Sequence, residues 1–235
     1  MAIEETSSHY SFYGKAIQMK TDSELKLDVE NELKWEPMVN EAHIGVTANG
    51  GVVSLAGHVL SFAEKYAAEK SAKRVYGVKA VANELDIRLH NGAMRSDEQI
   101  AQACLSALKN HSLVPYEKLK VVVSDGIVSL EGEVDWQYQR DAALNAVRDL
   151  IGVVSVTTRI SIKARTLPKD VKNKIIAAFH RNADIDARRI EVQTQEGKVV
   201  LHGNVRSWSE REQAQSAAWA APGVTAVEND IVVVP

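Results

Sequence analysis

Apolar residues recur along this chain with two different spacings, and segments with the two spacings follow one another in a fixed order. In three segments an apolar side chain recurs every four residues, which is the spacing of one helix face. These segments end at Leu33, Leu108 and Phe179. After each segment, apolar and polar residues alternate strictly through two short runs, as in strands with one buried face. We therefore predict a helix followed by two strands, three times over.

Polar residues mark the ends of these predicted elements. Residues suited to a helix start precede the three helical segments: Thr21 and Asp22, Ser96 and Asp97, and Pro168 and Asp170. Short turns rich in Asn, Asp, Glu and Gly separate the paired strands at 49–51, 124–126 and 195–197. Such turns between alternating runs predict β-hairpins.

A second helix and a third strand complete each unit. Segments rich in the helix formers Ala, Glu, Lys, Arg and Gln cover about 61–75, 136–150 and 207–221. A glycine that can take the left-handed conformation is predicted to end each helix, at Gly77, Gly152 and Gly223. Alternating third strands are predicted near 81–89, 154–162 and 225–234.

The three units are copies of one another in register. The hairpin sequence G-x-V-x-L-x-G-x-V begins at Gly51, Gly126 and Gly197. The second glycine of each copy is predicted to allow a bulge in its strand or the close approach of a helix. We predict an α+β protein of three tandem αββαβ domains, each with a three-stranded mixed sheet and two helices on one face. The predicted boundaries are 1–20 for an N-terminal extension and 21–90, 96–162 and 168–235 for the domains. Units of this size are marginal alone, so we expect them to pack together across their short links.

The repeat resembles the BON domain, a module named for bacterial osmotically inducible and nodulation proteins. The resemblance rests on the glycine hairpin, on basic residues at Lys65, Arg140 and Arg211, and on G-V-x-x-V-x-N at 77–83 and 223–229. Thr158 replaces the asparagine in the middle copy. The resemblance implies a non-enzymatic protein linked to osmotic or envelope stress that binds phospholipid or other surfaces.

Composition and charge limit the classes of binding partner and the location that we expect for this protein. The net charge is −3, without the basic excess that a phosphate backbone calls for, so nucleic acid is not expected. The first twenty residues carry no apolar run like that of a secretory signal, and no stretch is long and apolar enough to span a membrane. We therefore expect a cytoplasmic location, although proteins with the resembling domain are often periplasmic.

Candidate catalytic and metal-binding residues do not form a recognisable set. His58 and His202 lie beside the strand glycines, but the other copies carry no histidine at either position. Cys104 falls on the apolar face of a helix, where a buried small side chain is expected rather than a nucleophile. The glycines match no phosphate-binding loop. We expect no metal, no cofactor and no enzymatic activity, with an undetected hydrolase as the alternative.

Aromatic residues stand at the start of each second helix. They are Phe62, Trp136 and Trp208, with Trp136 one position earlier than the others. Two interpretations stay open: the ring staples the helix entry to its own hairpin, or it is an exposed anchor for a membrane or partner.

Only the third repeat has a positive charge balance, +2 over 163–235. A binding site is therefore predicted there, formed by Trp208, Arg206, Arg211, Arg188 and Arg189. Its predicted partner is an anionic phospholipid surface or a protein, and a solvated helix face is the plainer explanation of the charge. The alternative function is a soluble cytoplasmic interaction scaffold or small-ion sensor.

Overall fold

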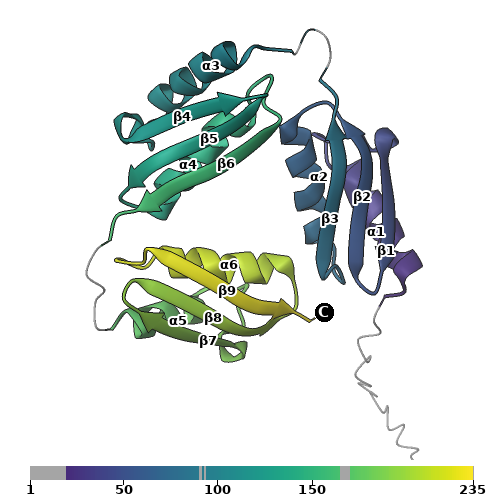
Figure 1. Ribbon diagram of the computed structural model, residues 1–235. Helices are drawn as coiled ribbons and strands as arrows, with labels where there is room; N and C mark the ends of the chain where they lie inside the picture. Colours follow the sequence, from purple (N-terminus) through teal and green to yellow (C-terminus); the bar gives the residue numbers. More distant parts are fainter. Residues whose placement is uncertain (1–19, 90–91, 93, 165–169, 235) are drawn as a thin grey trace, which may run out of the picture.

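The computed structural model describes residues 20–89, 92, 94–164 and 170–234. The predicted extension over 1–20 lies outside these residues apart from Lys20, as do parts of both links. Figure 1 shows three similar units placed around a common centre.

Each unit has the element order helix, strand, strand, helix, strand, with a single 3-10 turn before the first strand. The first repeat contains α1 (Asp22–Trp35), η1 (Glu41–His43), β1 (Ile44–Asn49), β2 (Val52–Val59), α2 (Phe62–Arg74) and β3 (Ala80–Ile87). The second contains α3 (Asp97–Asn110), η2 (Tyr116–Lys118), β4 (Leu119–Ser124), β5 (Ile127–Val134), α4 (Gln137–Arg148) and β6 (Ser155–Ile162). The third contains α5 (Val171–Arg181), η3 (Ala187–Arg189), β7 (Ile190–Gln195), β8 (Lys198–Val205), α6 (Trp208–Trp219) and β9 (Ala226–Val233). The predicted α+β class and repeat pattern are confirmed.

Each repeat has its own three-stranded mixed sheet. The middle strand pairs antiparallel with the strand before it and parallel with the strand after it. In the first repeat Leu55 faces Val46 on one side and Asn83 on the other. The parallel pairing explains the second helix, because the chain must cross over before the third strand can run alongside.

Both helices of a repeat cover the same face of its sheet. In the first repeat Leu25, Val29 and Leu33 of α1 are at most 2% exposed and join Val53 and Leu55 in one core. Burial of such a branched side chain contributes about 1.5–3 kcal/mol. The alternation therefore acts as predicted, with the apolar half of each strand beneath the helices.

The glycines refine two of the predicted details. Gly57, Gly132 and Gly203 have positive φ angles, and a side chain there would collide with the carbonyl oxygen of the 3-10 turn. The predicted close approach is therefore made by that turn rather than by a helix. The predicted helix ends were too late: α2 ends at Arg74, and Gly77 belongs to the turn that leads into β3.

Contacts between repeats are made by their second helices. Phe62 at the start of α2 packs against the core of the second repeat, and Trp219 at the end of α6 packs against the same core. Lys73 at the end of α2 places its Nζ 5.3 Å from the ring centroid of Trp208, at the start of α6. These contacts confirm that the repeats pack together, and they join all three units (Figure 1).

Candidate binding surface of the third repeat

Two of the predicted basic residues lie at one hollow on the third repeat. Arg188, from the turn before β7, and Arg206, from the loop before α6, line a polar hollow of about 570 Å³. The residues lining it are Ala183, Asp184, Ile185, Asp186, Arg188, Arg206, Ser207, Ser209 and Glu210. Residues 18 positions apart in the sequence are thus brought to one concave surface.

Glu210 fixes the two loops that carry these arginines. Its side chain is only 7% exposed and accepts hydrogen bonds from the backbone N–H groups of Asp186 and Arg206, both at 2.9 Å. A buried carboxylate is tolerated here because two charge-assisted hydrogen bonds offset its desolvation. Arg188 and Arg206 therefore approach one another through Glu210.

The first repeat contains an equivalent buried glutamate with two backbone hydrogen bonds, and the second repeat differs at this position. Glu64 accepts from the N–H groups of Asn40 and Leu60, at 2.9 and 2.8 Å. In the middle repeat Pro115 occupies the position of Asn40 and has no N–H group to donate. The neutral Gln139 stands there in place of glutamate, and it accepts from two backbone N–H groups on its own side of the junction. The sequence carried this signal, since a glutamate or glutamine recurs at the third position of each second helix.

Charge at the surface is only partly neutralised. Asp186 pairs with Arg188 at 3.1 Å and with Arg189 at 3.4 Å, and the hydrogen bond from Arg188 lowers the pKa of Asp186. Arg206 is exposed, and its guanidinium has no ion-pair partner within the described part of the chain. Arg188 and Arg189 also line a second hollow of about 430 Å³ with Lys172 and His202. The two hollows share Arg188. Together they are lined by four basic residues, Lys172, Arg188, Arg189 and Arg206, and by four acidic residues, Asp184, Asp186, Glu191 and Glu210.

Trp208 and Arg211 lie outside both hollows. Arg211 donates from Nε to the carbonyl of Ile231 and from Nη2 to that of Asn229, at 2.9 and 2.5 Å, and so ties α6 to β9. The Trp208 ring is half-buried, with Arg211 at 5.1 Å from its centroid and Lys73 of the first repeat on it as well. The structure thus separates the five predicted residues into a surface trio (Arg188, Arg189 and Arg206) and a pair inside the fold.

The aromatic residues at the helix starts differ in what they contact. Trp208 packs against the core of its own repeat, as the staple interpretation predicts. Phe62 packs instead against the core of the second repeat, which neither interpretation anticipated. Arg148 of α4 lies over Tyr66 of α2, 4.1 Å from the ring centroid, and reinforces that contact. The pattern of a single repeat cannot reveal such partners, because they belong to a neighbouring unit.

The repeat that carries Thr158 also differs from the others in a contact between repeats. In the first and third repeats the basic residue of the second helix, Lys65 or Arg211, donates to the third strand. The equivalent Arg140 instead lies over Trp219 of the third repeat, 5.1 Å from the ring centroid, and its Nε is buried without an acceptor. Desolvation lowers the pKa of Arg140.

Other candidate groups show no site chemistry. Cys104 is fully buried, and burial raises the pKa of its thiol to about 11, far from a thiolate nucleophile. His58 stacks near His43, and His202 lies 3.6 Å from Asp230. The part of the chain that the structure describes holds no group of three or more potential metal ligands.

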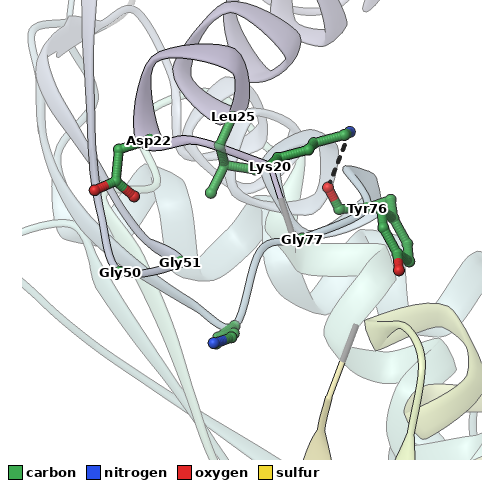
Figure 2. A pocket seen from close by; sticks show the side chains of 8 residues that line it. Lys20, Asp22, Leu25, Gly50, Gly51, Tyr76 and Gly77 are labelled. Atoms are coloured by element: carbon green, nitrogen blue, oxygen red, sulfur yellow. Dashed lines mark hydrogen bonds between the residues drawn. The ribbon is translucent and has the colours of Figure 1, made fainter. Parts of the chain in front are cut away.

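A small cavity of about 110 Å³ lies beside the hairpin turn of the first repeat (Figure 2). Lys20 donates to the backbone carbonyl of Tyr76 at 3.1 Å and pairs with Asp28 at 2.6 Å. Asp22 stands at the position where, in the second repeat, Asp97 accepts from the N–H groups of the hairpin turn. The cavity is smaller than the 300 Å³ or so of typical ligand pockets, so we assign it to the helix–turn junction.

Comparison with known proteins agrees with the repeat architecture. The BON domain family matches residues 21–88, 96–164 and 169–235. Osmotically-inducible protein Y of Escherichia coli (strain K12) is 27% identical over 148 residues, which cover 60% of this chain and 74% of that protein.

Two solved structures align along most of the chain. One is CdsD, described as a structural protein of the type III secretion system of Chlamydia trachomatis, with 18% identity, a TM-score of 0.26, and coverage of 90% of this chain and 93% of that one. The other is the CdsD C-terminal domain, with 17% identity, a TM-score of 0.25, and coverage of 92% and 100%. With TM-scores this low, the two structures indicate neither the arrangement of the repeats nor the function of this chain.

Proposed function

Since this chain belongs to the BON domain family and is distantly related to osmotically-inducible protein Y, we propose that it is a non-enzymatic binding protein of osmotic or envelope stress. Its third repeat binds an anionic surface, for which phospholipid is the first candidate and an acidic protein the second. No helix among the described residues has the length and apolar character needed to cross a bilayer. Binding is therefore proposed to be peripheral, and a cytoplasmic location stays a prediction.

One observation carries this proposal: Arg188 and Arg206 line the same hollow, with Arg189 and Lys172 beside it. A basic residue near an anionic membrane contributes about 1 kcal/mol, and several adjacent residues add up to useful affinity. Trp208 and Arg211 support the site from inside the fold, because they hold α6 in place and leave the contact to the exposed arginines.

Flotation with vesicles tests the proposal directly. Vesicles of phosphatidylcholine with phosphatidylglycerol should carry the protein at low salt and release it at high salt, since salt screens exposed charges. The double variant Arg188→Glu with Arg206→Glu should lower the bound fraction at least about tenfold. The matched control is Lys109→Glu with Lys120→Glu, which makes the same charge change at exposed positions of the second repeat.

The outcomes separate the candidate functions. Equal loss in the control would mean that overall charge matters rather than this surface. No flotation at either salt would remove the lipid proposal and favour the interaction scaffold or small-ion sensor.

A further inference from the structure

A separate crevice lies between the second and third repeats, away from the two hollows of the third repeat. It is formed by the start of α4 and the end of α6 and encloses about 420 Å³, within the range of small-molecule sites. The residues lining it are Trp136, Gln137, Tyr138, Asp141, Ser216, Trp219 and Ala220. No basic side chain is among them.

Gln137 presents an unsatisfied acceptor at this crevice. Its Nε2 donates to Oδ1 of Asp141 at 2.8 Å, which fixes the orientation of the amide group. Its Oε1 is then buried without any hydrogen-bond donor in the described structure. An unpaired buried acceptor costs about 1–3 kcal/mol, so a donor placed here would be bound favourably.

Asp141 adds a carboxylate to the crevice, and the neighbouring Arg140 attracts it without forming an ion pair. Among the described residues it forms no ion pair, although Arg140 is adjacent in the sequence, because the Arg140 guanidinium lies over Trp219 instead. Partial desolvation at the junction raises the pKa of Asp141. The hydrogen bond from Gln137 Nε2 holds the Asp141 carboxylate beside the amide group, and a bound cation would offset the desolvation of its charge.

The remaining walls also favour positive charge. Tyr138 is 52% exposed, and its aromatic face attracts cations through its quadrupole, whereas the Trp219 ring already lies under the guanidinium of Arg140. Ser216 and Ala220 bring the C-terminal end of α6 to the crevice, where the helix dipole leaves a partial negative charge. The carboxylate of Asp141, the amide oxygen of Gln137, the ring face of Tyr138 and the C-terminal end of α6 each favour a positively charged ligand.

We propose that this crevice binds a small organic cation with N–H donors, namely a primary ammonium group on a short alkyl chain, as in a diamine. The ammonium group donates to Gln137 Oε1 and Asp141, while the alkyl chain lies along the rings. A quaternary ammonium has no N–H group and leaves Gln137 unsatisfied. An inorganic cation requires more oxygen ligands than this largely aromatic crevice supplies.

Calorimetric titration of the full chain with 1,4-diaminobutane tests this assignment at constant ionic strength. We expect one saturable site, at least tenfold weaker binding of tetramethylammonium, and at least tenfold weaker diamine binding by Asp141→Asn. Glu133→Gln is the matched control, because it removes one exposed charge from the same repeat outside the crevice. It should bind the diamine like the unmodified chain.

A second variant tests whether weaker binding could result from unfolding rather than from a change at the crevice. Tyr138→Leu removes a ring face at a half-exposed position and should weaken diamine binding severalfold, with an unchanged circular dichroism spectrum and melting temperature. Equal affinity of Asp141→Asn and the unmodified chain, or no saturable binding, overturns the proposal. Neither outcome bears on vesicle binding by the third repeat, which uses other residues.

Discussion

At the scale of single residues, the third position of α6 matters more to the proposed binding surface than its charge suggests. Glu210 is acidic, yet it holds in place the two loops that carry Arg188 and Arg206. Its carboxylate is a positioning group: it contacts backbone amides, whereas the exposed arginines would contact a partner. Loss of an acidic residue is therefore expected to weaken binding to an anionic surface.

Replacement Glu210→Ala should lower the free energy of unfolding by about 2–3 kcal/mol, because two backbone N–H groups lose a charged acceptor. Glu210→Gln keeps one acceptor oxygen, so its free energy of unfolding should lie between those of Glu210→Ala and the unmodified protein. Urea denaturation measures the change, and flotation at a temperature where the variant is folded measures the effect on binding. Glu212→Ala, exposed two residues further along α6, should stay within about 0.5 kcal/mol. Equal stability of the two alanine variants would contradict the role given to Glu210.

At the scale of elements, the hairpin glycines show a constraint that the sequence only outlined. Gly57 in β2 pairs with Ile44, at the point where the chain leaves η1 and enters β1. Its φ angle is 128°, and an added Cβ would meet the carbonyl oxygen of His43. The backbone of the turn cannot withdraw without losing the first pairs of the hairpin.

Gly57→Ala should therefore destabilise the protein by about 3 kcal/mol, from strain at a positive φ and from displacement of the turn. Gly45, one residue along the partner strand, is the matched control. Its backbone is ordinary, and an added Cβ would lie 3.6 Å from the Ala56 carbonyl oxygen, so Gly45→Ala should change stability by less than about 1 kcal/mol. Urea unfolding followed by circular dichroism distinguishes the two variants. A tolerant Gly57→Ala would show that the turn can move.

The elements themselves could be predicted because their signals are local. A residue such as Leu55 is recognised from its alternating neighbours, and its burial beneath α1 follows from the same pattern. The helix ends were less predictable, since residues 75–77 form a turn in which the N–H of Val75 donates to Ala72 and the N–H of Val78 donates to Val75. The exposed arginines could be identified from charge, but the position of the half-buried Arg211 depends on carbonyl groups of β9, eighteen and twenty residues away.

Aromatic partners between repeats could not be predicted from the periodicity. Trp219 falls at the end of α6, where nothing in one repeat distinguishes a core residue from a contact with a neighbour. Its role becomes visible only when the second and third repeats are placed together, with Arg140 lying over its ring. The Thr158 departure was the available clue, because it marks the repeat whose basic residue is not tied to its own third strand.

At the scale of the whole molecule, the second helices form a closed cycle. The start of α2 meets the second repeat, the start of α4 meets the end of α6, and the start of α6 meets the end of α2. This is a head-to-tail contact that closes after three units, within one chain rather than between copies. The first and third repeats are not consecutive, so their contact is the one that closes the ring.

Lys73→Glu should open this ring at the contact between the first and third repeats. A carboxylate in place of the ammonium group loses the attraction to the Trp208 ring, about 0.5–2 kcal/mol depending on its desolvation, and it also repels Glu69 one turn earlier. Small-angle X-ray scattering should then report a larger radius of gyration, while circular dichroism shows the repeats still folded. Lys70→Glu, an exposed position on the same helix, should leave the scattering unchanged. Trp208→Leu should reproduce the opening from the other side of the contact. Identical scattering from all of these proteins would mean that the links and the contacts of the middle repeat hold the ring closed without this pair.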